Sequence, residues 1–172
     1  MHQANLYGKE VAMKECKNIL FCTDFSEDAN HAFIHALGLA EKNDARLHIL
    51  HIPHSPYVYC KHIVDEHVPE GAPCGESFFN AEIVERAEED LRREYADKLN
   101  GYKNYTLAVR DGLPYVEIVR YAKKNDIDQI VMGDRGKYEL DRIERGSTVD
   151  KVVRYSRFPL TSVNGKPIPH KR

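Results

Sequence analysis

Residues 17–40 read KNILFCTDFSEDANHAFIHALGLA, and this stretch decides the fold because it joins a buried strand to an amphipathic helix. Residues 17–22 form a compact apolar run without a helical period, which is typical of a strand buried on both faces. Ser26 is a preferred helix N-cap residue, and apolar residues then recur at helical three- and four-residue spacing. The stretch therefore predicts a strand and a helix, with polar Thr23 and Asp24 where the strand ends.

The alternation of strands and helices continues through the rest of the chain. Residues 46–52 (RLHILHI) predict a second strand whose side chains alternate between two faces, and Pro53 ends it. Later strands are predicted at residues 105–109, 127–132 and 158–163. Further helices are predicted at residues 80–99, from Pro114 to about Asn125, and around Val149, Val152 and Val153.

Strands that alternate with helices indicate a parallel sheet, because parallel neighbours need crossover connections. We therefore expect an α/β fold with a five-stranded, doubly wound parallel sheet, covered by helices on both faces as a three-layer sandwich. Ligands of such sheets bind outside the carboxyl ends of the strands, near a topological switch point. This rule selects residues 22–24, Ile52 and residues 132–133 as candidate site positions.

Length and composition suit one domain without a global charge excess. The chain has 172 residues, 42% of them hydrophobic, with 25 basic and 27 acidic residues, which argues against a nucleic-acid partner. No apolar run is long enough to span a bilayer, so we expect no membrane partner, a cytoplasmic protein and reduced cysteines. The predicted domain covers residues 16–164, with tails at 1–15 and 165–172 and an irregular, proline-rich insertion at 53–77.

A glycine pattern begins at the end of the fourth predicted strand. Gly133 and Gly136 are followed by Gly146 and Ser147, with the spacing G-x2-G-x9-G-S, and the last helix starts near Thr148. Glycines let a backbone approach phosphate closely, and a helix start offers free N–H groups. The alternative is that the first two glycines shape an ordinary turn and that the second pair is an ordinary helix start. The order of these features at a carboxyl edge favours phosphate binding.

Asp24 lies at another carboxyl edge of the predicted sheet. Its carboxylate is suited to accept hydrogen bonds from ribose hydroxyls, as acidic residues do in other dinucleotide-binding folds. An isolated aspartate at this position would more simply cap the following helix. Together with the glycine pattern, Asp24 favours an adenine nucleotide as the ligand.

Three segments of the chain resemble the universal stress protein family: residues 17–32, residues 46–52 and residues 130–153. The last contains the complete G-x2-G-x9-G-[ST] signature of the family's ATP-binding branch, and the resemblance covers about residues 15–164. It implies a Rossmann-like fold, similar to the adenine nucleotide alpha hydrolases, and ATP as cofactor. The implied nucleotide-binding residues are Thr23, Asp24, Ile52, Met132, Gly133, Arg135, Gly136, Gly146, Ser147 and Thr148. Asp134 departs from the family's usual serine and places a carboxylate near the phosphates, where it could hold Mg2+ or point to solvent.

Two other kinds of site are not expected. Several histidines and cysteines, the residue types that bind zinc, lie in or near the insertion: His48, His51, His54, Cys60, His62, His67 and Cys74. No two of them have the close spacing of a zinc site. No nucleophile, base and acid occur together, so we expect no catalytic residues and weak or no ATP hydrolysis. The leading hypothesis is a nucleotide-dependent regulatory protein of the stress response. The alternative is an enzyme of related fold that cleaves ATP or transfers AMP.

The last predicted strand, residues 158–163, must lie at an edge of the sheet. Phe158, Leu160 and Val163 make it apolar, and no lysine protects it, although Pro159 removes one donor. If this strand pairs with the same strand of a second copy, the unpaired backbone groups of both edges are hydrogen-bonded. We therefore expect a homodimer that pairs through residues 158–163. Alternatively, residues 164–172 cover the edge and the protein is a monomer. The sequence does not identify a downstream partner.

Overall fold

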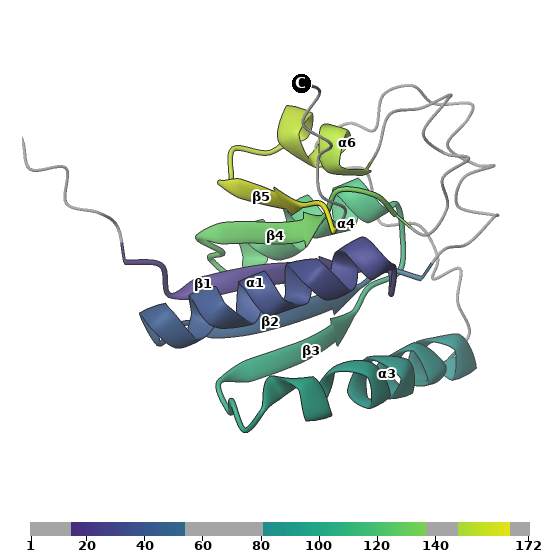
Figure 1. Ribbon diagram of the computed structural model, residues 1–172. Coiled ribbons are helices and arrows are strands. Elements are labelled where there is room, and N and C mark those ends of the chain that lie inside the picture. Colours follow the sequence, from purple (N-terminus) through teal and green to yellow (C-terminus); the bar gives the residue numbers. More distant parts are fainter. Residues whose placement is uncertain (1–14, 54–80, 137–147, 166–172) are drawn as a thin grey trace, which may run out of the picture.

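The computed structural model describes residues 15–53, 81–136 and 148–165, which form one parallel sheet and the helices around it (Figure 1). The strands are β1 (Asn18–Thr23), β2 (Arg46–His51), β3 (Tyr105–Val109), β4 (Gln129–Gly133) and β5 (Leu160–Val163). The helices are α1 (Glu27–Asn43), α3 (Ala81–Tyr95), α4 (Pro114–Lys124) and α6 (Thr148–Tyr155), with a 3-10 turn, η1, at Asp97–Leu99. Every strand and helix predicted from the sequence is present, and the α/β fold class is confirmed. Of the predicted insertion, only Pro53 is described.

The five strands are all parallel and lie in the order β3-β2-β1-β4-β5. The chain adds β2 and β3 on one side of β1 and then returns to add β4 and β5 on its other side. The switch point is therefore between β1 and β4, where Cys22 pairs with Met132. β5 is an edge strand, as predicted.

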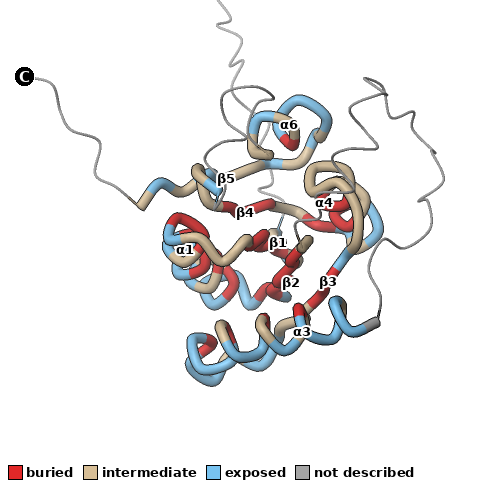
Figure 2. Tube along the Cα trace, turned by 90° about the vertical axis from the view of Figure 1, so that its right-hand side faces the viewer, coloured by how far each residue is buried: buried red, intermediate tan, exposed pale blue. Residues whose placement is uncertain are grey.

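Two apolar cores lie on opposite faces of the sheet, because successive side chains of each strand point to opposite faces. Alternate residues of β1, such as Ile19 and Phe21, pack with α1 and α3, whereas Leu20 and Cys22 pack with α4 and α6. Figure 2 shows α1 and α4 on opposite sides of the buried strands. No helix among the described residues is long and apolar enough to cross a membrane.

The start of α1 follows the predicted capping pattern. Ser26 has an extended backbone, and its side-chain oxygen accepts a hydrogen bond from the N–H of Ala29 at 3.2 Å. At the far end, Asp44 adopts a left-handed conformation that turns the chain into β2. The β1–α1 turn is thus held at a defined position above the switch point, where the candidate site lies.

Candidate functional site at the switch point

The carboxyl ends of β1 and β4 bring together two sequence-predicted regions that are more than 100 residues apart. A β-carbon built on Gly136 would lie 2.9 Å from Oδ2 of Asp24, so the glycine turn and this carboxylate are in direct proximity. Oδ1 of Asp24 accepts a hydrogen bond from the N–H of Ser26 at 3.0 Å. Asp24 therefore stabilises its own turn and also borders the glycine turn, so that the capping role and the ligand role considered for it are compatible.

The hydroxyl of Thr23 points into the protein interior. Thr23 is 6% exposed, and its Oγ1 lies 2.6 Å from the hydroxyl oxygen of Tyr95, the last residue of α3. The same Oγ1 accepts a hydrogen bond from the N–H of Phe25 at 3.0 Å. Burial raises the pKa of Tyr95 to about 12, against the opposing effect of the bond with Thr23. Thr23 thus links the β1–α1 turn to α3.

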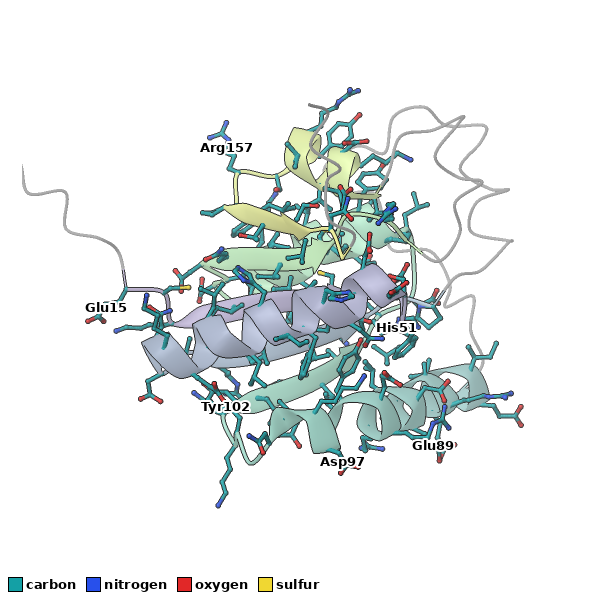
Figure 3. The ribbon with its side chains drawn as sticks, in the orientation of Figure 1. Glu15, His51, Glu89, Asp97, Tyr102 and Arg157 are labelled. Atoms are coloured by element: carbon teal, nitrogen blue, oxygen red, sulfur yellow. The ribbon has the colours of Figure 1, made fainter. Side chains whose placement is uncertain are left out.

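Phe25 and His51 form an aromatic pair at this edge that the sequence patterns did not assign to the site. Phe25 adopts a positive φ of 61°, and its ring centroid lies 4.4 Å from that of His51. Nδ1 of His51 lies 2.8 Å from the carbonyl oxygen of Thr23, which can only accept, so Nδ1 donates. Figure 3 shows His51 at the end of β2. The positive φ of Phe25 and this inter-strand bond are products of the fold, and no local sequence signal marks them.

Gly133 makes the closest approach between β4 and α1. A β-carbon at this position would lie 2.7 Å from the backbone nitrogen of Ala29 and 2.8 Å from the carbonyl carbon of Asp28. Backbone atoms cannot move aside as a flexible side chain can. Gly133 is therefore required by helix packing, whatever it contributes to a ligand.

Arg135 is held by α1 and by the residue after β5. Its Nε donates to Oδ2 of Asp28 at 3.0 Å, and its Nη2 donates to Oδ1 of Asn164 at 2.7 Å. Burial acts to raise the pKa of Asp28, but the hydrogen bonds and charge of Arg135 and the N–H of Gly165 outweigh it and lower that pKa below 3.8. The sequence placed Arg135 among the nucleotide-binding residues; in the structure its guanidinium contacts protein carboxylate and amide oxygens.

Of the five other predicted site residues, the structure describes three. Met132 is 6% exposed and belongs to the core shared with α4 and α6, and Ile52 packs against that core. Thr148 is the first residue of α6. Gly146 and Ser147 lie outside the described residues, so the second half of the glycine pattern is not located.

Of the seven histidines and cysteines weighed as metal ligands, the structure describes two, both buried in β2. His48 lies with Nδ1 3.0 Å from the hydroxyl of Tyr121, on the α4 face, whereas His51 bonds to Thr23. Side chains that are three positions apart in a strand point to opposite faces of the sheet. His48 and His51 are therefore on different faces of the sheet and do not converge on one ion.

The strand order and its switch point define a Rossmann-like α/β fold, and comparison with known proteins names the family. The universal stress protein family model matches residues 15–164, and the chain belongs to this family. Universal stress protein MJ0531 of Methanocaldococcus jannaschii is 31% identical over 151 residues, covering 86% of this chain and 81% of the relative.

Solved structures agree on the fold. The structure of MJ0577 is similar with a TM-score of 0.67 at 24% identity, covering 90% of this chain and 99% of that one. A universal stress protein from Archaeoglobus fulgidus, solved in complex with dAMP, has a TM-score of 0.54 at 19% identity and covers 86% of this chain and 96% of its own. These likenesses confirm the predicted fold class, and the match to the family model confirms the predicted family.

Proposed function

We propose that this protein binds ATP at the switch point and acts as a nucleotide-dependent regulatory module of the stress response. The observation that carries the proposal is the proximity of Asp24 and Gly136 across β1 and β4. An adenine nucleotide needs a carboxylate for its ribose and a close-approaching backbone for its phosphates, a few ångströms apart. This edge of the sheet offers both.

Every predicted residue except Arg135 has a direct role in this proposal. Asp24 accepts from the ribose, and the backbone of Ile52 borders the adenine. Thr23 lines the same pocket, and Met132 lies beside the ribose and phosphates. The phosphates contact the N–H groups of Gly133, Gly136 and Gly146 and the helix start at Ser147 and Thr148, where Mg2+ can accompany them. The complex of the Archaeoglobus fulgidus relative with dAMP supports an adenine nucleotide as the ligand class.

Binding without rapid hydrolysis is the proposed activity. The carboxylates in and beside the glycine turn are engaged in holding loops: Asp24 with the N–H of Ser26, Asp28 with Arg135, and Asp134 with the hydroxyl of Ser162. A general base must instead be able to take a proton from water. The competing function is an enzyme that cleaves ATP or transfers AMP. Turnover above about 1 per second, the low end for dedicated phosphoryl-transfer enzymes, would favour that enzyme.

We also propose that the protein is a cytoplasmic homodimer that pairs through β5. One edge of β5 bonds to β4, and the other edge has backbone groups that a second copy can satisfy. Nucleotide occupancy then alters the shape or assembly of the dimer, and a downstream protein responds to that change.

Calorimetry with ATP tests the binding proposal. We expect micromolar affinity, equivalent to roughly 7 to 8 kcal/mol. Asp24→Asn retains the acceptor for the N–H of Ser26 but removes the charge, so it should cost about 1.5 to 3 kcal/mol of binding while the protein stays folded. Mass spectrometry of protein purified without added nucleotide should detect a bound adenine nucleotide. A folded protein that leaves ATP unbound at millimolar concentration contradicts the proposal.

A further inference from the structure

Asp28 is a buried carboxylate that accepts four hydrogen bonds from two distant parts of the chain. It lies in the first turn of α1, is 6% exposed, and accepts from three donor groups of Arg135: the backbone N–H at 3.1 Å, Nε at 3.0 Å and Nη2 at 3.4 Å. The N–H of Gly165, after β5, donates to it at 3.2 Å. One buried carboxylate thus joins α1, the residues after β4 and Gly165, the second residue after β5.

The bond from the backbone of Arg135 distinguishes this contact from an ordinary ion pair. Because Asp28 binds the N–H as well as the guanidinium, it fixes the path of the main chain between Gly133 and Gly136. The hydroxyl of Ser26 donates to the carbonyl oxygen of Arg135 at 3.2 Å, so the same peptide segment is held from both its N–H and C=O groups. Charge-assisted bonds of this kind are stronger than bonds between neutral groups.

We infer that Asp28 is a positioning residue, which sets the glycine turn in place for phosphate through Arg135 without contacting the nucleotide. The inference rests on the proposed function, because it assigns a phosphate-specific role within the ATP site. Backbone N–H donors recognise phosphate only when they point into one concavity, so a small displacement of the turn costs affinity. The ribose carboxylate, Asp24, is held separately by Ser26.

A different role for Asp28 makes the opposite prediction. If Arg135 binds phosphate directly, Asp28 competes with the nucleotide for the guanidinium, and its removal must strengthen ATP binding. If Asp28 positions the turn, its removal must weaken ATP binding. The sign of the change in affinity therefore distinguishes positioning from competition.

The test compares ATP with adenosine, which lacks phosphates, on the full-length protein carrying Asp28→Asn. We expect the dissociation constant for ATP to rise about tenfold, since a charge-assisted bond is replaced by a neutral one, and that for adenosine to stay unchanged. Glu27→Gln is the matched control: it removes the same charge from the same helical turn at an exposed residue. Neither dissociation constant should change in this control.

Several outcomes would overturn the inference. In Asp28→Asn, these are tighter or unchanged ATP binding, or an equal loss of affinity for ATP and adenosine. A third is the same loss of ATP affinity in Glu27→Gln. Where circular dichroism shows that Asp28→Asn does not fold, Asp28→Ser is measured in its place, because the small hydroxyl leaves room for a bridging water. A wild-type protein that binds neither ATP nor adenosine refutes the proposed function itself, which is a result distinct from all of these.

Discussion

A β-carbon on Gly133 would lie 2.7 Å from the backbone nitrogen of Ala29, so the end of β4 and the first turn of α1 are in contact without room for a side chain. Gly133→Ala should therefore destabilise the fold, since the helix must move away from the sheet. We expect a loss of about 1 to 3 kcal/mol in the free energy of unfolding, measured by denaturant titration. Gly38→Ala is the control, because Gly38 is an exposed residue of α1 and its β-carbon would meet nothing within 4 Å. It should stabilise the protein slightly.

Gly136→Ala should weaken ATP binding with little change in stability. The added β-carbon would meet only Oδ2 of Asp24, the end of a side chain, at 2.9 Å. The carboxylate can turn aside, but it then leaves the position proposed for the ribose contact. We expect about a tenfold higher dissociation constant by calorimetry, equivalent to roughly 1.4 kcal/mol. Unchanged ATP affinity in the folded variant would contradict the placement of the nucleotide between these residues.

Ser162→Pro should convert the proposed dimer to a monomer. The N–H of Ile130 donates to the carbonyl of Pro159 and that of Asp134 to the carbonyl of Val163, so odd-numbered residues of this segment face β4. Because the bonds of a parallel strand alternate between its two sides, the N–H of Ser162 faces the open edge. Proline removes that donor and leaves the bonds to β4 intact.

Light scattering measures this change in assembly. We expect the mass to fall from twice the 19.8 kDa chain to that of one chain. Ser162→Ala is the matched control, since it retains the N–H but loses the hydroxyl bond to Asp134. A wild-type mass of one chain refutes the dimer. Leu160→Lys is a less specific test, because Leu160 also packs against the α4 and α6 core.

Stability should fall between pH 6.5 and 4 because of His48. Burial, followed by the charge of Arg46, lowers the pKa of His48 from 6.5 to about 4. In this window the unfolded chain binds a proton that the folded protein does not, so acid favours unfolding. The stability that neutral His48 contributes is complete above pH 6.5, and up to about 3 kcal/mol is lost as pH falls to 4.

Denaturant titrations at pH 7.5 and 4.5 measure this dependence. His48→Asn keeps a partner for the hydroxyl of Tyr121 but cannot titrate, so its stability should change much less between the two pH values. Asp28 affects stability in a separate, more acidic pH range. Because its pKa is lowered in the folded protein, its contribution to the free energy of unfolding is lost only as pH falls below 3.8. A variant with the same pH dependence as the wild type would exclude His48 as the cause.

Much of the fold could be predicted from local sequence alone. Apolar runs and helical spacing predicted each strand and helix, and Ser26 predicted the start of α1, because side-chain periodicity and capping act within a few residues. The alternation of strands and helices also predicted a parallel, doubly wound sheet, whereas the strand order β3-β2-β1-β4-β5 is known only from the structure. Element ends were less well predicted: the helix expected to reach residue 99 ends at Tyr95 and continues as the turn η1.

The sequence by itself determined the type of fold, its family and the residues that border the switch point, because these depend on motifs and short-range patterns. Only the tertiary structure decided what those residues contact. Asp28 and Arg135 are 107 positions apart, and Thr23 and Tyr95 are 72 apart, so no spacing rule connects them. Their pairing depends on the packing of α1 and α3 against the carboxyl ends of the strands. That packing buries Thr23, Tyr95 and Asp28, and buried polar groups must find partners within the protein.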